Sequence, residues 1–249
     1  RAMGAILYHF LKLKLRLAIA GFSPRLFDYD WRRSVIDLGR ALATEVAHDA
    51  SPHIQVVAHS MGGLVARAAL ALPGGERIER LVMLGTPNSG SFAPVQALRG
   101  TYAVVRKLAA LDQMHTAETL ASEVYSTFPG LYELLPAEGT TAVDLFDPAV
   151  WPARGPRPEP ALLAAARSSL RGLASADTRM ALIAGYGRPT VTGVRRSGAD
   201  FEYLVTRNGD GTVPLAIAEL PGVGNWCFRE GHSELTTNDV VASAVIDLL

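Results

Sequence analysis

The sequence of 249 residues contains a single cysteine, Cys227. One cysteine excludes an intrachain disulfide framework and any zinc module built from several cysteines. Net charge is also lacking, because 24 Lys and Arg side chains balance 24 Asp and Glu side chains. This balance argues against a nucleic-acid partner held by a global basic field. The acidic residues form no D-x-D-x-D-G calcium pattern and the histidine spacing offers no zinc site, so we expect no metal site.

Long apolar runs are missing as well. The most hydrophobic early stretch, residues 5–20, is interrupted by three basic side chains and is too short to cross a bilayer. We expect a helix there that packs on a sheet; a cationic helix lying on a lipid surface is the alternative interpretation. Its apolar face would consist of Leu7, Leu11, Leu15 and Ala18. The lone cysteine and the lack of a leader in this sequence favour the cytoplasm, and secretion is the alternative if a leader was lost with an upstream segment.

What the sequence does contain is an alternation of short apolar runs and amphipathic segments. The apolar run at residues 53–58 is typical of a parallel strand buried on both faces. A helix is expected before this strand, and Ser34, with Asp37 three residues later, predicts its capped start. Strands alternating with helices predict an α/β fold with a mainly parallel, doubly wound sheet. The expected strands cover residues 25–30, 53–58, 81–84, 180–184 and 225–228, with a hairpin at 191–205 and a closing helix at 240–249.

Strand signals disappear between residues 88 and 178. This stretch holds helical segments rich in Ala and Leu, and a Pro-rich run at residues 148–160. A long insertion between two core strands is either a cap over an active site or a loose loop. We favour the cap, and predict a core formed by residues 1–87 and 179–249 with a cap or lid formed by residues 88–178.

The strongest chemical signal is A-H-S-M-G-G at residues 58–63, between a predicted strand and a predicted helix. It matches the nucleophile elbow G-x-S-x-G, with Ala58 in place of the first glycine. Small residues are needed because the backbone turns sharply and holds the serine in strained φ/ψ space, which exposes its hydroxyl. The pattern predicts Ser60 as a nucleophile and the Met61 N–H, at the helix N-terminus, as an oxyanion donor.

A serine nucleophile needs a base, and the base needs a carboxylate that orients it. With an elbow the chain order is Ser, then Asp or Glu, then His, and only His115 and His232 follow Ser60. His115 falls in the predicted cap, whereas His232 follows the last expected strand and is the expected base. Asp210, in the glycine-flanked turn G-D-G-T-V-P, is the expected acid. The competing carboxylates, which lack this turn chemistry, are Asp177, Asp200 and Glu202.

Two other residues near these patterns are expected to be structural. His59 neighbours the nucleophile, but on an elbow it should point away from the serine hydroxyl and serve as a packing or hydrogen-bonding residue. Cys227 lies on the last expected strand. We expect its side chain to be buried and to pack as a small hydrophobic group, rather than to act as a reactive thiol.

These blocks resemble the lecithin:cholesterol acyltransferase-like branch of the α/β-hydrolases and the neighbouring bacterial lipases. The resemblance rests on residues 58–67 (A-H-S-M-G-G-L-V-A-R), 84–91 (L-G-T-P-N-S-G-S), 209–214 and 230–232 (E-G-H), and D-Y-D-W-R at residues 28–32 is similar to the Y-D-W-R signature of that branch. It implies the α/β-hydrolase fold, a nucleophile at Ser60, an acid at Asp210, a base at His232, an acyl-ester substrate (usually a lipid) and no cofactor. It also implies that residues 84–87 lie near the active site.

One departure concerns the second oxyanion donor. In the family this donor comes from a Gly-containing loop upstream of Y-D-W-R, whereas here Gly4 is the only glycine before Gly21. We expect either that the first strands of the fold are absent from this chain or that the donor is built differently. Lack of one donor costs roughly 3 kcal/mol in the transition state.

Three functions remain open at this point. The leading prediction is a lipase or carboxylesterase that works through a Ser-His-Asp triad and an acyl-enzyme. An acyltransferase would use the same triad but pass the acyl group to an alcohol. A hydrolase-like module that binds a small-molecule or lipid partner without turnover is the third, although it has no need of all three triad residues.

Overall fold

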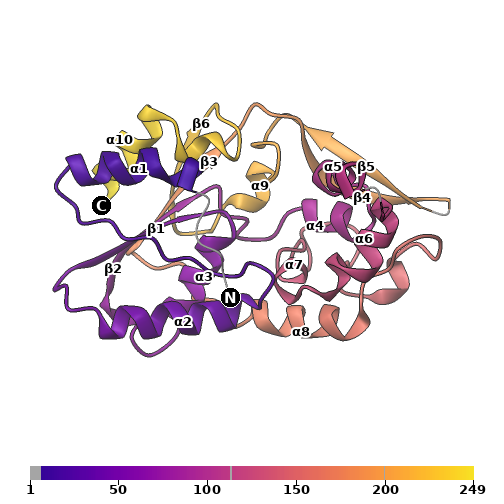
Figure 1. The fold of residues 1–249 in the computed structure, drawn as a ribbon, viewed down its shortest axis with the longest axis horizontal. Coiled ribbons are helices and arrows are strands. Elements are labelled where there is room, and N and C mark those ends of the chain that lie inside the picture. The colour runs from indigo at the N-terminus through magenta and orange to yellow at the C-terminus, as the bar shows by residue number, and fades with distance from the viewer. Residues whose placement is uncertain (1–6, 113, 199) are drawn as a thin grey trace.

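The computed structural model describes residues 7–112, 114–198 and 200–249 (Figure 1). Its centre is a four-stranded sheet in the order β1-β2-β3-β6, and every neighbouring pair is parallel. These strands are β1 (Ile54–His59), β2 (Ile78–Leu84), β3 (Met180–Gly185) and β6 (Gly224–Phe228). Four of the expected strands are thus confirmed, with ends that shift by at most three residues. A mainly parallel sheet is confirmed as well.

Helices cover both faces of this sheet (Figure 1). On β2 the side chains of Leu81 and Met83 join the cluster under α2 and α3, whereas Val82 and Leu84 join the cluster under α1 and α10. This alternation explains the apolar run, because both sides of the strand are buried. The four helices are α1 (Leu7–Ile19), α2 (Val35–His48), α3 (Met61–Leu70) and α10 (Asp239–Leu248).

The apolar face expected for α1 is wrong. Leu13 and Leu17 are buried against the sheet, whereas Leu11 and Leu15 are 47% and 54% exposed. In this orientation Lys12 and Arg16 lie on the exposed side of the helix and form ion pairs with Asp239 at the start of α10. A lipid-surface contact by the exposed side of α1 stays a prediction. In the part of the chain that the structure describes, no helix is long and apolar enough to cross a membrane.

The segment at residues 25–30 is not a strand. Its alternate side chains Phe27 and Tyr29 still pack against the cluster under α2, and Asp28 between them is exposed. The pattern that predicted a strand is therefore real, but none of the described strands pairs with this segment, and β1 pairs only with β2. Without a hydrogen-bonded neighbour the chain stays extended and irregular.

Ser34 caps α2 as expected, since its hydroxyl accepts a hydrogen bond from the Ile36 N–H at 3.2 Å. Asp37, however, does not complete the cap and pairs with Arg40 instead. The carboxylate that completes the cap is that of Glu133, which lies far along the chain. It accepts hydrogen bonds from the Ser34 hydroxyl and the Val35 N–H. Burial raises the pKa of the Glu133 carboxyl despite these bonds. The cap thus ties α2 to the helical segment beyond β2.

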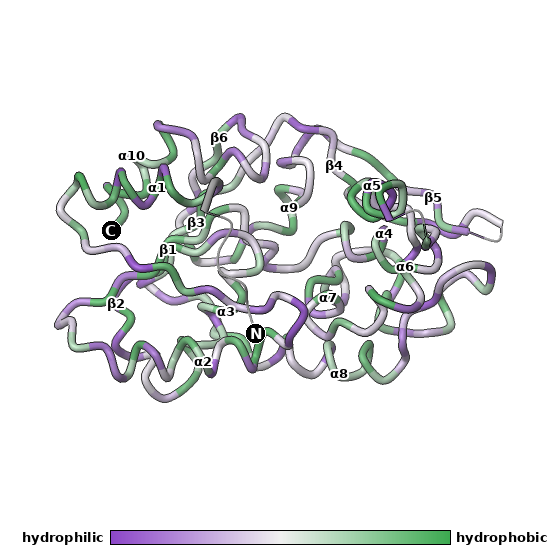
Figure 2. Tube along the Cα trace, in the orientation of Figure 1, coloured by the Kyte–Doolittle hydropathy of each residue, from purple (hydrophilic) through white to green (hydrophobic). Residues whose placement is uncertain are grey.

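Residues 88–178 contain helices and no strand among those the structure describes. They form a second hydrophobic cluster beside the sheet layer, together with the antiparallel hairpin of β4 (Thr190–Ser197) and β5 (Asp200–Thr206), as the right half of Figure 1 shows. Figure 2 shows α5 as largely hydrophobic, although three of its apolar side chains are exposed. The helices of this region are α4 (Ala93–Leu98), α5 (Ala103–Asp112), α6 (Ala117–Glu123), α7 (Pro129–Tyr132) and α8 (Pro160–Leu170).

Shorter elements complete the chain. The one-turn helix α9 (Leu215–Ala218) follows the 209–214 turn. The 3-10 turns are η1 (Gly75–Arg77), η2 (Tyr125–Thr127), η3 (Pro148–Val150) and η4 (Glu234–Thr236). Cys227, expected to be buried, is exposed. The reason is that β6 is an edge strand, paired only with β3, so it lacks the cover of the central strands.

Candidate active site

Ser60 stands on the sharp turn between β1 and α3 with φ 55° and ψ −128°. It is the one non-glycine residue with a positive φ in the described ranges 7–112, 114–198 and 200–249. Such a conformation is costly for a residue with a Cβ and persists only where the surroundings enforce it. The Ser60 N–H is fixed by the Leu84 carbonyl of β2 at 2.8 Å. Its hydroxyl makes no capping bond to α3, which leaves it free for another partner.

That partner is His232. Its Nε2 lies 2.8 Å from the Ser60 Oγ, and its Nδ1 lies 2.8 Å from the Asp210 Oδ2. The structure therefore brings together the nucleophile, base and acid expected from the sequence, although 172 residues separate Ser60 from His232. An imidazole held in this way by a carboxylate presents its other nitrogen to accept the serine proton.

Asp210 is buried in the turn predicted for it. Its Oδ1 accepts hydrogen bonds from the Thr212 and Val213 N–H groups at 2.9 and 2.7 Å, so Oδ2 is left for His232. The Asp210 carbonyl also accepts a bond from the His232 N–H at 2.8 Å. Backbone and side-chain contacts together set the separation of acid and base.

His59 is a structural residue, as expected. Its Nε2–H donates to the His232 carbonyl at 2.9 Å, and the two rings lie 4.7 Å apart between centroids. Burial lowers the pKa of His59 to about 4, and the neighbouring His232 adds to this effect. The ring is therefore neutral at pH 7 and helps to position the base without competing for its proton.

The other sequence candidates lie elsewhere. Asp177 pairs with Arg179, Asp200 with Arg99, and Glu202 with Arg195. His115 pairs with Asp112 on the surface. Each competing carboxylate thus forms an ion pair with an arginine. Of the four carboxylates considered, it is Asp210 that hydrogen-bonds to His232.

Two expected neighbours of the triad are in place. Met61 is the first residue of α3, directly after Ser60. The turn at residues 84–87 borders the site, because a Cβ built on Gly85 would lie 3.2 Å from both the Asp210 Oδ2 and the His232 Nδ1. A side chain at this position would crowd both Asp210 and His232.

A row of partly exposed aromatic side chains near the triad was missed by sequence reasoning. The Trp31 and Phe128 rings meet edge to face at 5.4 Å, and Tyr125 lies 5.7 Å from Phe128. Tyr102 continues the row and lies near the Thr212 side chain, two residues after Asp210. The other end reaches the elbow, since a Cβ on Gly130 would lie 2.9 Å from the Met61 Cε. No local pattern links residues this far apart in the sequence.

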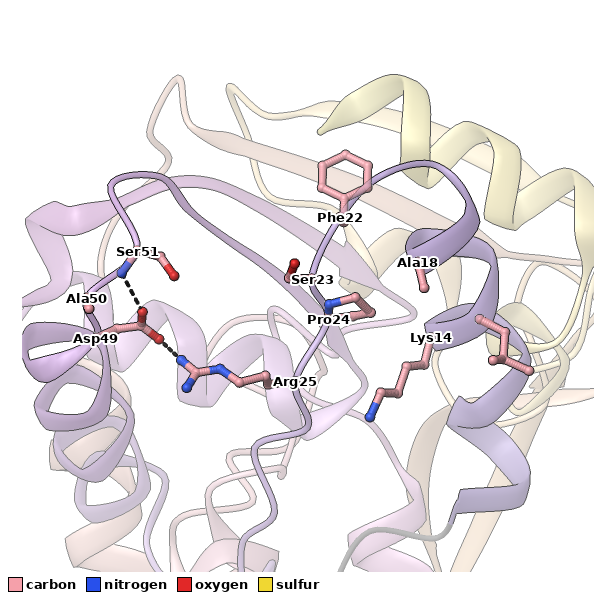
Figure 3. A pocket seen from close by; sticks show the side chains of 10 residues that line it. Lys14, Ala18, Phe22, Ser23, Pro24, Arg25, Asp49, Ala50 and Ser51 are labelled. Carbon is pink, nitrogen blue, oxygen red and sulfur yellow. Dashed lines mark hydrogen bonds and ion pairs between the residues drawn. The ribbon is translucent and has the colours of Figure 1, made fainter.

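No group of three or more His, Cys, Asp or Glu residues suited to a metal ion occurs in the described part of the chain. A groove of about 670 Å³ lies away from the triad, between α1 and the segment that leads into β1 (Figure 3). Ser51 on its wall precedes β1, whereas Ser60 follows β1, so groove and triad lie at opposite ends of the strand.

The chain was compared with known protein families and solved structures. A family model described as "PGAP1-like alpha/beta domain" matches residues 35–128, which include Ser60. The lipase BlEst2 of Bacillus licheniformis, in its mature form, is 15% identical with a TM-score of 0.57, covering 95% of this chain and 83% of that one. A chain of the Tle4–Tli4 complex is 17% identical with a TM-score of 0.56, covering 88% and 67%. No curated protein matches the sequence.

The chain has the α/β-hydrolase fold. The parallel sheet, the helices on both faces and the serine turn between β1 and α3 are the features that the fold requires. Its structural neighbours include lipases.

Proposed function

We propose that the protein is a serine hydrolase that cleaves acyl esters. The observation that carries the proposal is the continuous chain of hydrogen bonds from Ser60 through His232 to Asp210, with both side-chain distances at 2.8 Å. A binding module has no use for an unfavourable serine backbone conformation and a buried acid aligned with it.

In the proposed reaction the Ser60 Oγ attacks the ester carbonyl carbon while His232 Nε2 takes the hydroxyl proton. The carbonyl oxygen becomes an oxyanion, which accepts a hydrogen bond from the Met61 N–H. The tetrahedral intermediate collapses, and His232 gives the proton to the departing alcohol. Water then attacks the acyl-enzyme, with His232 again as the base, and releases the carboxylic acid and free Ser60.

The aromatic row supports an apolar acyl group as the substrate. It runs from Trp31 beside the elbow to Tyr102 beside the Asp210 turn, and Trp31 is 44% exposed. Aromatic rings that are open to solvent near a reacting centre bind apolar chains by burying their surface. Residues 88–178, which supply most of the row, would accordingly act as the cap, and lipid esters are the class that fits.

Steady-state hydrolysis of p-nitrophenyl esters with acyl chains of 2 to 12 carbons tests the proposal. We expect turnover that rises with chain length and is lost in Ser60→Ala. Phe128→Ala should weaken the preference for long chains about tenfold and leave acetate hydrolysis unchanged. Added alcohol should not divert the acyl group into a new ester. A folded protein without turnover of any ester would contradict the proposal.

A further inference from the structure

One donor is too few for the oxyanion in the proposed reaction. Sites of this kind place at least two hydrogen-bond donors around the developing charge, and removal of one costs about 10² to 10³ in kcat. The Met61 N–H supplies one. A second donor must lie at the same end of α3, so the residues packed against that end are the candidates.

Tyr29 occupies this position. Gly62 is the second residue of α3, and the Cα–Cβ bond of a helical residue tilts toward the helix N-terminus. A Cβ built on Gly62 would lie 3.4 Å from the Tyr29 hydroxyl and 3.8 Å from the Ala58 Cβ. The Tyr29 hydroxyl therefore lies at the N-terminal end of α3, where the Met61 N–H is also located.

The Tyr29 hydroxyl is free to donate. No hydrogen bond or ion pair joins it to any residue in the described part of the chain. Burial raises its pKa to about 12, so the phenol keeps its proton throughout the neutral range. A hydroxyl that no residue of the described chain engages keeps its donor available for a ligand.

The ring that carries this hydroxyl is held in place. Tyr29 packs against the cluster under α2, with its ring 6.0 Å from that of Phe27. The following residues are also fixed, because Arg32 forms hydrogen bonds with both carboxylate oxygens of Asp30, and the Arg32 carbonyl accepts a bond from the Gly130 N–H at 3.1 Å. A donor on a rigid support needs little rearrangement when charge develops.

We propose that the Tyr29 hydroxyl is the second oxyanion donor, which rests on the proposed serine-hydrolase function. The hydroxyl donates a hydrogen bond to the carbonyl oxygen of the ester as that oxygen gains negative charge, and it keeps its own proton. This assigns to Tyr29 of the D-Y-D-W-R segment a direct part in the proposed reaction.

Tyr29→Phe tests the proposal, because it keeps the ring and removes only the donor. The readout compares an oxygen ester with the matching thionoester, whose sulfur is a weak hydrogen-bond acceptor. We expect kcat for the oxygen ester to fall about 100-fold, KM to stay within threefold, and the thionoester rate to fall less than fivefold. Tyr203→Phe, which removes a phenol hydroxyl from β5, is the matched control and should change neither rate.

The outcomes separate this proposal from the one on which it rests. If the wild type hydrolyses no ester, the proposed function fails. If the wild type is active and Tyr29→Phe keeps kcat within twofold, the role of Tyr29 is wrong while the triad stands. Equal losses for the oxygen ester and the thionoester would also overturn it, because a general disturbance of the fold lowers both rates alike.

Discussion

The sheet region and the helical region of this molecule are built from different side chains. The buried side chains around the parallel sheet are aliphatic or methionine, such as Leu64, Leu81 and Ile183. The cluster formed by residues 88–178 and the β4–β5 hairpin buries large aromatics in addition to aliphatic side chains, namely Phe92, Tyr132, Phe146, Trp151 and Phe201. The sheet region is encoded by apolar runs that recur along the chain, whereas the helical region has no such repeated pattern.

The two regions also supply different parts of the candidate active site. Ser60, Asp210 and His232 follow strands or turns at one edge of the sheet, where regular backbone hydrogen bonds fix their positions. Three of the four partly exposed aromatics that would contact substrate come from the helical region. Under the proposed function, the reaction would depend on the regular part of the molecule, and the choice of substrate would depend on the irregular part.

The largest effect should come from Asp210→Asn, which removes the charge that orients His232 and changes nothing in the helical region. We expect kcat to fall about 10⁴-fold, with the free energy of unfolding within about 1 kcal/mol of the wild type. Ester kinetics and urea unfolding measure the two quantities. A loss of activity below tenfold would show that the acid lies elsewhere.

Trp151→Ala tests the aromatic region. Trp151 is fully buried, and its indole N–H donates to the Leu145 carbonyl at 2.9 Å. We expect a loss of about 3–5 kcal/mol in the free energy of unfolding, with faster amide exchange in α4 to α8 than in β1 to β3. Trp151→Phe should lose less. Equal acceleration of exchange in both regions would contradict two separately built regions.

The free energy of unfolding should depend on pH because of the lowered pKa of His59. Its pKa is lowered to about 4 in the folded state from 6.5, so the unfolded chain binds the proton first as the pH falls. Stability is therefore full above pH 6.5 and is lost between pH 6.5 and 4, by roughly 3 kcal/mol in total. In His59→Gln this part of the loss should vanish. Parallel curves for the wild type and the variant would exclude His59 as the cause.

Gly63→Ala should disturb the sheet region by crowding. A Cβ at Gly63 would collide with the Thr86 side chain, which is completely buried. We expect a loss of about 1–3 kcal/mol in the free energy of unfolding, most of which the second substitution Thr86→Ala should restore. If the double variant is no more stable than the single one, the two side chains do not meet.

The smallest effect concerns Thr86 alone. Its hydroxyl is buried and has no hydrogen-bond partner among the described residues. Thr86→Val replaces it with a methyl group of similar volume, so we expect the free energy of unfolding to rise by about 1 kcal/mol. Thermal or urea unfolding measures the change. A loss of 1 kcal/mol or more would indicate that the hydroxyl has a partner.

The features that the sequence predicted are those encoded locally. The strand–serine–helix turn needs only small residues around Ser60, and the Asp210 turn needs its flanking glycines. The parallel strands follow from apolar runs buried on both faces. In each case a few neighbouring residues carry the whole signal, and the structure places the elements where the sequence predicts them.

The features that were mispredicted or missed depend on partners distant in the sequence. The 25–30 segment has the alternation of a strand but no described strand beside it. The face of α1 that is buried depends on the residues of β2, β3 and α10 packed against Leu13 and Leu17, and the cap of α2 is completed by Glu133. Cys227 is exposed because β6 is an edge strand. Periodicity reports which side of an element is apolar, but the elements that will cover that side lie elsewhere in the chain.

Covalent labelling tests the central claim most directly. The wild type and Ser60→Ala are incubated with a fluorophosphonate probe, and the modified peptide is identified by mass spectrometry. An activated serine attacks phosphorus and expels fluoride, so we predict one adduct per chain, on the peptide that contains Ser60, and none in Ser60→Ala. Labelling that persists in the variant, or a folded wild type that is not labelled, would contradict the assignment of Ser60, His232 and Asp210 as a catalytic triad.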